Sequence, residues 1–367
     1  MNTEEFRRLV DIPGPFVSAY LDDSRSDAAK RPNVEWRSLS SKLEHMGADP
    51  SALDHMEHAI LHSRPAVGRQ GRAVVVTRER VLINEHVSRP PAAPVLRVSD
   101  YPFLVPLVEF GYAHPPYVFV AVDRSGAEIT VHSDGDLRTE VVEGEGYPVH
   151  KAATSGFSGY VDFRSTTDEA IRVNVRAVAE RITEIVDQMS PDVVFVSGEV
   201  RSRNDVISEL PPRVAQKVSQ LHAGSRGQRA NETELGELVK GVLQRLGCVE
   251  IAETVRKYLA EMESKSGMAV EGISAVCTAL RARNVAALII GLVGDATVVT
   301  GADRAVVAPD ADTLSLMGEP VSRVARADEA LPFAAIAVDA ALVAVDDSLT
   351  LTDGIGALLR FSAGDGM

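Results

Sequence analysis

The stretch TTDEAIRVNVRAVAERITEIVDQMSPDVVFVSG, residues 166–198, decides the fold. Thr166 and Glu169 have the spacing of a capping box, which predicts that a helix begins here. Apolar residues then recur every three or four positions, at Ile171, Val175, Val178, Ile182 and Ile185, as on one buried helix face. A buried strand is predicted directly afterwards, at 192–198. A long helix followed by a buried strand predicts an α/β layer at the centre of the chain.

The segments on either side extend this pattern. Residues 117–137 predict a strand hairpin that turns at Arg124-Ser125-Gly126. Residues 146–166 form an irregular stretch rich in glycine, serine and aromatic residues. Beyond the central strand, another strand is predicted at 216–221, and helical segments extend to about residue 265.

The two ends of the chain predict further mixed structure. The first part has a helix at 51–63, two short strands within 72–85 and a proline-rich stretch typical of a linker or sheet edge. The last part begins with an amphipathic helix at 269–282, with Val270, Ile273, Cys277 and Leu280 on one face. Because 367 residues are too many for one ordinary core, we expect an α/β (α+β) protein of three domains, 1–113, 114–265 and 266–367.

Composition limits the function. The formal net charge of -14 argues against a general nucleic-acid coat, because phosphate binding normally needs a basic face. Any RNA contact is therefore expected in a few local loops. No run approaches the ~20 apolar residues that span a bilayer, and the start MNTEEFRRLV does not resemble a signal peptide. With only two cysteines, which cannot form a disulfide framework, we expect a cytoplasmic protein.

Two local patterns bear on chemistry. His55, His58 and His62 fall on one predicted helix at spacings suited to zinc, but without an HExxH glutamate we expect a solvated or interdomain face and no metal. GEVRSR (198–203) follows the central strand and could bind an anion through backbone N–H groups and Arg201 or Arg203. A plain strand-to-helix turn with solvated arginines is the alternative.

From residue 115 onward the order of elements resembles the archaeal and eukaryotic class-I peptide release factors and their relative Pelota. YVFVAVDRSGAEITVHS (117–133) looks like the opening of their middle domain. VVFVSGEVRSRNDVISELPPRVAQKV (193–218) resembles the strand, turn and helix that follow their long helix. The resemblance implies a three-domain, release-factor-like architecture.

The whole chain also resembles the actinobacterial members of the Balon family of ribosome hibernation factors. The strings that carry this likeness are RPAVGRQGRA (64–73), NEH (84–86), SDYPF (99–103), GYPVHK (146–151), VFVSGEVRSR (194–203) and RVARADEALPFAAIAV (323–338).

Release factors carry a GGQ loop whose glutamine lies beside the ester bond of peptidyl-tRNA. The corresponding stretch here is Ser155-Gly156-Phe157-Ser158-Gly159-Tyr160, and no glutamine occurs between Gln70 and Gln188. Arg226-Gly227-Gln228 imitates the motif by letters but follows a predicted strand instead of preceding the long helix. The resemblance therefore implies a binding protein that is not an enzyme, with no catalytic residue and no cofactor.

The resemblance also implies which residues contact rRNA. The loop 146–164 would enter the peptidyl-transferase centre, and an ordinary surface loop is the alternative. Cations can meet phosphates and aromatic rings can stack on bases, so the candidates are His150, Lys151, Ser155, Gly156, Phe157, Ser158, Gly159, Tyr160 and Arg164. Lys30, Arg31 and Arg37 would lie on the decoding-centre side, or form a solvated helix face. Arg201, Arg203, Arg226 and Arg229 are further candidate contacts.

Two functions are compatible with this sequence. The first is a hibernation factor that fills the vacant A site of the ribosome, with affinity built from small contacts on linked domains. The second is a Pelota-like rescue or termination factor that acts on stalled ribosomes. By resemblance, EF-Tu or the ribosomal stalk base is a partner of the C-terminal domain, and the protein is a monomer off the ribosome with no membrane partner. A nuclease-like or metal-binding stress protein built on the histidine helix is a third interpretation.

Overall fold

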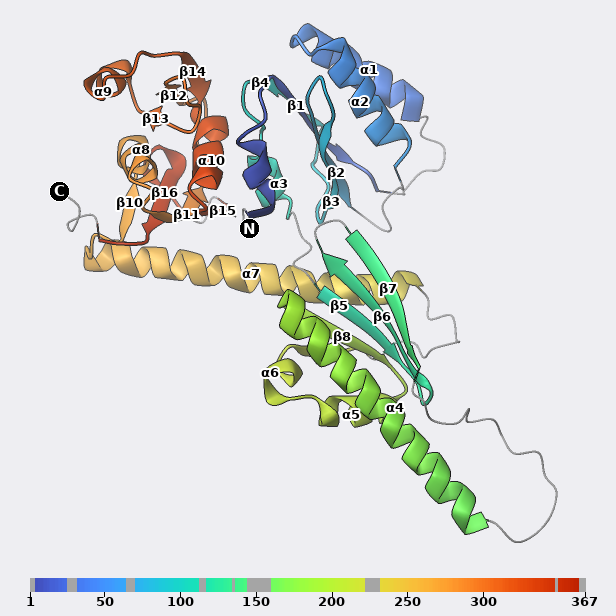
Figure 1. Cartoon of the computed structure of the whole chain (residues 1–367). Helices are drawn as coiled ribbons and strands as arrows, with labels where there is room; N and C mark the ends of the chain where they lie inside the picture. The colour runs from blue at the N-terminus through green and yellow to red at the C-terminus, as the bar shows by residue number, and fades with distance from the viewer. Residues whose placement is uncertain are drawn as a thin grey trace. The chain divides into compact units, whose positions relative to one another are not determined.

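The computed structural model describes residues 4–24, 32–63, 70–111, 117–133, 136–143, 160–221, 232–346 and 349–362. The chain forms two compact units, whose elements are labelled in Figure 1. The middle unit comprises residues 114–243, and the terminal unit combines residues 1–113 with residues 244–367. The two ends of the chain, expected as separate domains, therefore build one unit together.

The N-terminal half of the terminal unit is an antiparallel sheet of order β3-β2-β1-β4. Its strands are β1 (Phe16–Asp22), β2 (Gly71–Val76), β3 (Val81–Val87) and β4 (Val95–Ser99). Helices α1 (Pro32–His45) and α2 (Pro50–Leu61) cover one face, where Leu43 and Met56 pack against Val74. The 3-10 helix η1 (Glu4–Leu9) and helix α3 (Val105–Glu109) pack on the other face. The helix and the two strands predicted in this region are confirmed.

The C-terminal half contains two sheets. The larger, of order β10-β16-β11-β15, consists of β10 (Ala269–Glu271), β11 (Val285–Ile290), β15 (Ala341–Ala344) and β16 (Ile355–Leu359). The smaller, of order β13-β12-β14, consists of β12 (Thr297–Thr300), β13 (Val307–Ala308) and β14 (Arg323–Arg326). Its helices are α8 (Ile273–Arg281), α9 (Ala311–Leu316), α10 (Ala327–Ala337) and the 3-10 helix η2 (Thr352–Gly354). The long helix α7 (Glu232–Ser264) contains the boundary between the two units.

The helix expected at 269–282 begins later than predicted. Val270 lies in strand β10, and Gly272 follows with φ +85, a conformation that favours glycine. Helix α8 begins at Ile273, whose N–H donates to Asp353 Oδ2 at 3.1 Å. Cys277 and Leu280 are buried as expected. The prediction for Val270 was wrong. Its spacing from Ile273 fits a helix face, but Gly272 separates the strand that contains Val270 from the helix that begins at Ile273.

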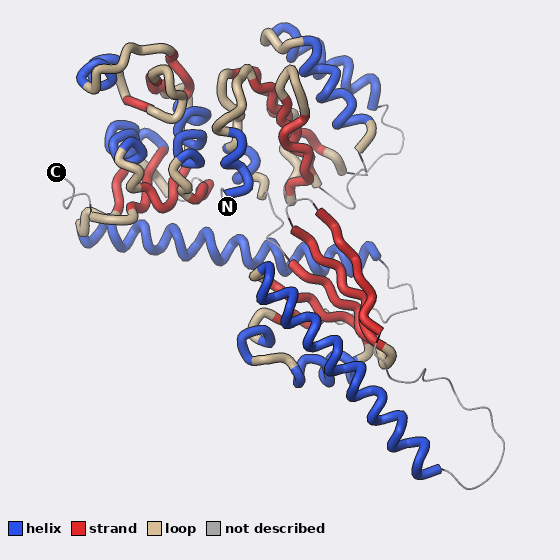
Figure 2. Tube along the Cα trace, viewed as in Figure 1, coloured by secondary structure: helices blue, strands red, loops and turns tan. Residues whose placement is uncertain are grey.

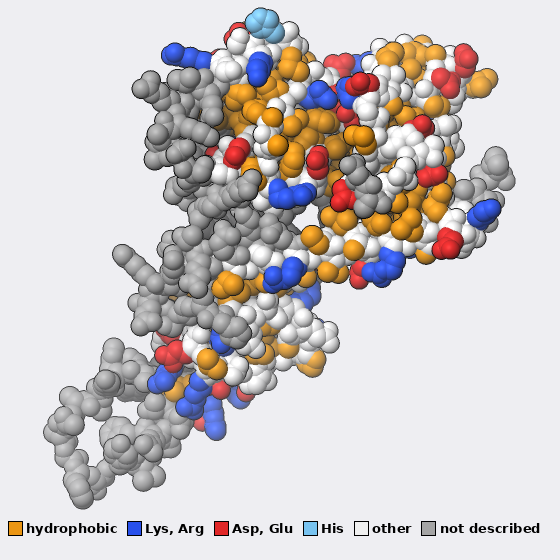
Figure 3. Space-filling view, turned by 180° about the vertical axis from the view of Figure 1, so that it is seen from behind, with side chains coloured by type: hydrophobic (Ala, Val, Ile, Leu, Met, Phe, Trp, Pro, Cys, Tyr) orange, Lys and Arg blue, Asp and Glu red, His pale blue; other side chains and the backbone are white. Residues whose placement is uncertain are grey.

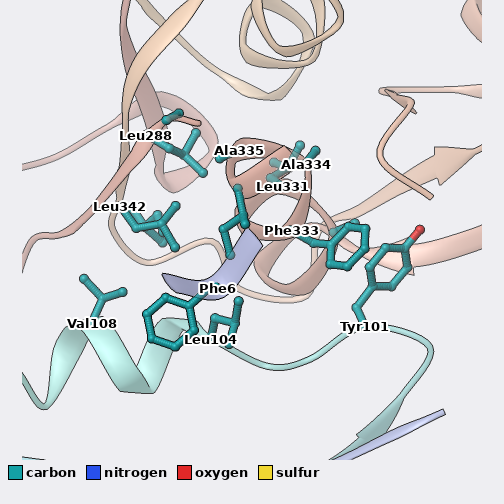
Figure 4. Packing of buried hydrophobic residues seen from close by; sticks show 14 of the residues in the cluster. Phe6, Tyr101, Leu104, Val108, Leu288, Leu331, Phe333, Ala334, Ala335 and Leu342 are labelled. Atoms are coloured by element: carbon teal, nitrogen blue, oxygen red, sulfur yellow. The ribbon is translucent and has the colours of Figure 1, made fainter. Parts of the chain in front are cut away.

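One hydrophobic core joins the two halves of the terminal unit. Helix α10 is buried from Glu329 to Ile336, so neighbours surround it. Figure 4 shows Phe6 and Leu104 of the N-terminal half facing Leu331 of this helix. The Tyr101 ring meets Phe333 edge-on, with 5.2 Å between the ring centroids. Burial of apolar surface between segments far apart in sequence therefore holds this unit together.

Arg304, in the loop between β12 and β13, adds polar bonds to this core. Its guanidinium donates to the backbone carbonyls of Asp100 at 2.9 Å, Val10 at 3.2 Å and Ile12 at 2.6 Å. The same group lies 4.9 Å from the centroid of the Phe333 ring, as in a cation–π contact. A single side chain of the C-terminal half thus bonds two separate segments of the N-terminal half.

The middle unit is a mixed sheet of order β7-β6-β5-β8-β9. Its strands are β5 (Tyr117–Val122), β6 (Gly126–Ser133), β7 (Asp136–Glu143), β8 (Val193–Gly198) and β9 (Val218–Gln220). Helices α4 (Tyr160–Met189), α5 (Val200–Glu209) and α6 (Pro212–Ala215) lie together beside this sheet in Figure 2. Leu243, in the N-terminal half of α7, packs on the other face against Phe195. The predicted α/β layer is confirmed, and so is the hairpin, whose turn is closed by Asp123 Oδ1 accepting from the Ser125 N–H at 2.7 Å.

Candidate nucleic-acid interface

Helix α4 positions the candidate interface of the middle unit. Val178, Ile182 and Ile185 pack against the sheet, as the helical spacing predicted. Among its described side chains, contacts with this core begin at Ile171. At ~1.5 Å per residue, the eleven residues of α4 that precede Ile171 carry the helix well past this contact, as Figure 1 shows. The end of α4 that follows the predicted loop is therefore helical, and it lies beyond the packed part of the unit.

Helix α4 begins at Tyr160, so the predicted start at Thr166 was wrong. Tyr160 and Arg164, expected in an irregular loop, belong to the first turns of the helix. Residues 160–169 contain neither glycine nor proline, the two residues that most strongly oppose a helix interior. The helix therefore continues N-terminally past the capping-box letters. The other loop candidates, His150, Lys151, Ser155, Gly156, Phe157, Ser158 and Gly159, lie outside the described residues.

The turn after β8 depends on Gly198. Its φ is +136, and a Cβ at this position would lie 2.2 Å from the Val122 carbonyl oxygen on the neighbouring strand. Only glycine permits this close approach at the end of β8. Glu199 then precedes helix α5, whose first turn carries Arg201. The Arg201 side chain is 75% exposed and lies 3.8 Å from Asp205, so it can reach a phosphate.

Arg203, predicted from the same GEVRSR string, faces the other way. It is 2% exposed, and its guanidinium donates to the backbone carbonyl of Leu221, which follows strand β9. The prediction that Arg203 contacts rRNA is therefore corrected: this side chain joins α5 to the end of β9. Two residues along a helix rotate the side chain by about 200°, which explains why one arginine is exposed and the other is buried. Arg226 and Arg229 lie outside the part of the chain that the structure describes.

Further exposed arginines lie on the same unit as Arg201. The backbone carbonyl of Arg124, in the hairpin turn, accepts from Asn174 Nδ2 at 3.1 Å, which joins this turn to α4. The Arg124 side chain lies 3.5 Å from Glu199, immediately before α5. Arg172 on α4 is 79% exposed and pairs with Glu169 at 3.7 Å. We call Arg124, Arg172 and Arg201 the arginine group, and Figure 3 shows Lys and Arg side chains gathered on this unit.

The ion pairs of the arginine group are loose and exposed. Their nitrogen-to-oxygen distances are 3.5, 3.7 and 3.8 Å. Such pairs contribute about 0–1 kcal/mol each, so an RNA phosphate can replace the carboxylate at little cost. Arginine also suits phosphate because its planar guanidinium can donate two parallel hydrogen bonds. The arginine group is therefore available for phosphate binding without loss of the fold.

Arg181, one of the next arginines along α4, is held differently. It donates to Glu140 on β7 through Nε at 2.5 Å and Nη2 at 2.9 Å, and to Glu184 at 2.7 Å. The hydrogen bonds from Arg181 lower the pKa of the Glu140 carboxyl despite some burial. This bidentate pair joins α4 to the edge strand of the sheet, so Arg181 has a structural role.

A second polar group lies where β1 leaves the sheet of the terminal unit. Asp23 accepts from Arg72 Nη2 at 2.7 Å and Nε at 3.0 Å, and lies 3.1 Å from His86 Nε2. Arg72 also donates to Asn84 Oδ1 at 2.9 Å. Burial opposes ionisation of Asp23, but its bonds to His86 and Arg72 hold its pKa below the usual value. This network joins the end of β1 to strands β2 and β3.

Sequence reasoning missed this network, although a signal was present. Asn84 and His86 alternate on β3, and β3 pairs with β2 so that His86 lies opposite Arg72. Polar residues at alternate positions opposite an arginine predict a bonded cluster on one face of a sheet. Of the predicted decoding-side residues, Arg37 is exposed on α1, and Lys30 and Arg31 lie outside the described residues.

Two other expectations concern metal binding and membranes. The ring of His58 on α2 stacks on the ring of His62, which caps this helix, with 4.5 Å between their centroids. In the described part of the chain, no three His, Cys, Asp or Glu side chains are arranged to hold a metal ion. No described helix combines the length and the apolar character required to cross a bilayer.

The middle unit matches a known family of domains. Residues 116–264, from the sheet to the end of α7, match the model of Bacterial archaeo-eukaryotic release factor family 2. This part of the chain therefore resembles a bacterial family of release-factor relatives.

The relatives extend over the whole chain. Two Mycobacterium tuberculosis proteins, MT2704 and Rv2629, are each 50% identical to it over 365 residues, which is 99% of this chain and 98% of theirs. The chain belongs to the family of these mycobacterial proteins.

Several solved structures are similar at low identity. The archaeal translation termination factor aRF1 has 14% identity over 98% of this chain and 99% of its own, with a TM-score of 0.26. Archaeoglobus fulgidus Pelota has 12% identity over 98% and 92%, with a TM-score of 0.37. Archaeal Pelota in a model of ribosome-bound Pelota and ABCE1 has 13% identity over 98% and 93%, with a TM-score of 0.40.

Proposed function

We propose that this protein is a ribosome hibernation factor that binds the vacant A site. In this function it reaches the decoding and peptidyl-transferase centres, blocks tRNA binding and protects idle ribosomes. One observation carries the proposal: the release-factor family match includes the segment before α4, yet that segment contains no glutamine. A member of this superfamily without that side chain retains a means of binding while lacking the group used for hydrolysis.

The arrangement of the middle unit supports binding without covalent chemistry. Helix α4 presents its N-terminal turns beyond the packed sheet, and the arginine group provides exposed guanidinium groups on the same unit. Phosphate contacts of this kind supply affinity and orientation. We therefore propose a binding protein that is not an enzyme and needs no cofactor, with the loop 146–159 as the part that enters the peptidyl-transferase centre.

The proposed setting and partners follow from the superfamily. The protein acts in the cytoplasm on ribosomes, contacts rRNA of both subunits and is a monomer off the ribosome. EF-Tu or the ribosomal stalk base is the proposed partner of the C-terminal half. Archaeal Pelota, one of the similar proteins, is described as ribosome-bound, and ribosome binding is carried to this chain as a proposal.

A Pelota-like rescue factor is the second candidate. The absence of the GGQ glutamine is compatible with it, because a rescue factor of this type recruits others instead of hydrolysing the ester itself. The two functions differ in the ribosome they select. Hibernation requires preference for vacant ribosomes, and rescue requires preference for ribosomes stalled with peptidyl-tRNA.

Co-sedimentation with purified ribosomes tests the proposal. The full chain is mixed with vacant, stalled and translating ribosomes, and a variant replaces residues 155–159 with a short Gly-Ser linker. Stopping at 159 leaves α4 intact, because the helix begins at Tyr160. The intact protein should pellet with vacant ribosomes and the variant clearly less. Preference for stalled ribosomes would favour rescue, and absence of pelleting with every ribosome would reject both functions.

A further inference from the structure

Two strands of the terminal unit are the last strands of their sheets. Strand β4 ends the order β3-β2-β1-β4, and β14 ends the order β13-β12-β14. Each therefore pairs on one side only within the described residues, and β4 is half-exposed along its whole length. Unpaired strand edges expose backbone N–H and C=O groups that can accept another strand.

An open groove lies between these two strands. A cavity of about 410 Å³ is lined by Arg97 to Tyr101 on one side and by Arg323 to Arg326 on the other, with Glu329 beside them. A second hollow, of about 560 Å³, continues along β4 past Leu96 to Lys42 and His45 of α1. Met46 lines both hollows. The groove thus follows β4 and continues to β14, which is the shape that an extended peptide requires.

The charges of the groove differ from those of the whole chain. The chain carries a formal net charge of -14, whereas Lys42, Arg97 and Arg323 line the groove together with only two carboxylates, Asp100 and Glu329. Arg97 Nε is buried and lies 3.4 Å from Glu329. Arg323 lies 3.3 Å from Asp100 in an exposed pair. The Arg97 and Arg323 side chains are 32% and 36% exposed, so each can contact an added carboxylate.

The fourth cation of the groove, Arg326, is already engaged. It bonds Asp295 at 2.7 Å and Asp328 at 2.9 Å. Val324, on the same strand β14, is 69% exposed. Exposed apolar side chains beside unpaired backbone favour a peptide ligand, because alternate residues of an added strand can cover them.

We propose that this groove binds an extended acidic segment of a partner protein, which pairs as an added strand with β4 and reaches β14. Main-chain hydrogen bonds to the strand edges would supply the affinity, and acidic side chains facing Arg97 and Arg323 would supply the specificity. An RNA strand is less suited, because its sugar-phosphate backbone could not pair with the alternating N–H and C=O groups of the strand edges. This site lies in the terminal unit and uses none of the residues assigned above to rRNA.

A defined peptide tests this site in the full chain. The probe is a fluorescein-labelled peptide of about eight residues in which glutamate alternates with valine, long enough to follow one strand. Binding is measured by fluorescence anisotropy, and hydrogen exchange reports which amides become protected. A lysine-for-glutamate peptide and a labelled oligouridylate serve as competing ligand classes. We expect saturable binding of the acidic peptide alone, with protection at residues 95–99 and 323–326.

Two variants link the binding to the groove. Arg97→Gln combined with Arg323→Gln should weaken peptide binding about tenfold, as loss of charged contacts does at an interface. Val324→Glu changes one exposed side chain and should weaken binding through repulsion without affecting the fold. Arg256→Gln is the matched control, because Arg256 is exposed on α7 away from the groove lining, and it should bind as the parent does.

Several results would overturn the proposal. These are no binding of the acidic peptide, equal binding of the lysine peptide, and binding that neither groove variant weakens. Groove-dependent binding of oligouridylate would assign the groove to RNA. Concentration-dependent dimerisation with protection of the same strands would assign it to a second copy of this chain. No ribosome is present in this assay, so its outcome is independent of the hibernation proposal.

Discussion

The two units of this protein are built in opposite ways. The middle unit is one continuous segment, in which hairpins and a long helix pair neighbouring parts of the chain. The terminal unit joins the two ends of the chain, and one of its hydrogen bonds links Arg304 to Val10 across 294 positions of sequence. Local changes in the middle unit therefore leave the rest of the protein intact, whereas the terminal unit requires both ends at once.

The largest expected effect comes from the shared core of the terminal unit. Phe333 is fully buried between the two halves, against Tyr101 and Arg304. Phe333→Ala should lower the free energy of unfolding of this unit by about 3–5 kcal/mol, through lost burial and a remaining cavity. Urea unfolding followed by hydrogen exchange of each unit measures the change. Phe195→Ala, at a fully buried position of the middle unit, is the matched control and should destabilise that unit instead. Equal shifts in both units would show that they unfold together, contrary to the comparison.

The next effect concerns the polar bonds of the same core. Arg304→Met removes a guanidinium that donates to three backbone carbonyls of the N-terminal half. Loss of charged donors to buried acceptors should cost about 2–3 kcal/mol. The same unfolding assay applies, with Arg256→Met on the exposed side of α7 as a control. If Arg304→Met and Arg256→Met were equally stable, the contact between the halves would depend on apolar packing alone.

Much of the middle unit could be predicted from the sequence. Its hairpin and the buried face of α4 follow from local spacing, because β5 pairs with the next strand, β6, and the apolar residues of α4 recur at helical intervals. The joint core of the terminal unit could not be predicted. Apolar spacing shows that α8 has a buried face, but it does not show that the N-terminal half shares the core to which that face belongs. Three separate domains were expected for this reason.

The candidate site was predicted less well than the fold. Arg201 and Arg203 are the same residue type in one short string, and only the helix geometry decides that the first is exposed and the second is buried. The roles of Arg124 and Arg172 depend on Asn174, which bonds the hairpin turn to α4 across 50 positions. Sequence patterns identify charged residues, and tertiary contacts determine which of them remain available to a ligand.

The Glu329 carboxyl should have a smaller effect on stability than Phe333 or Arg304, and this effect should depend on pH. Burial between the two halves raises the pKa of its carboxyl, although Ser99 donates a hydrogen bond to it at 2.5 Å. A carboxyl with a raised folded pKa stabilises the fold most below its unfolded value near 4.5, and this stability is lost as pH rises through the folded value. The free energy of unfolding of the parent, relative to Glu329→Gln, should therefore decrease from pH 4.5 toward neutral pH.

Asp23, in the same unit, should make the free energy of unfolding change with pH in the opposite direction. Its folded pKa is lowered, so its contribution is present above the unfolded value near 3.8 and is lost as pH falls through the folded value. Asp23→Asn should thus reduce stability at neutral pH and matter less in acid. Urea unfolding at a series of pH values separates the two variants. A difference from the parent that does not change with pH would mean that the carboxyl titrates at its ordinary value.

The smallest effect on stability, and the sharpest test of function, compares two arginines of α4. Arg181→Gln breaks a bidentate pair with Glu140 and should destabilise the middle unit by about 1 kcal/mol. Arg172→Gln removes one loose, exposed pair and should change stability by less than about 0.5 kcal/mol. Ribosome binding should show the reverse order. Arg172→Gln combined with Arg201→Gln should weaken co-sedimentation with ribosomes. The double variant should also reduce the salt dependence of binding, because fewer phosphate contacts release fewer counterions. Arg181→Gln could instead weaken ribosome binding as much as the double variant does, without loss of stability. Phosphate contact could then not be assigned to the arginine group.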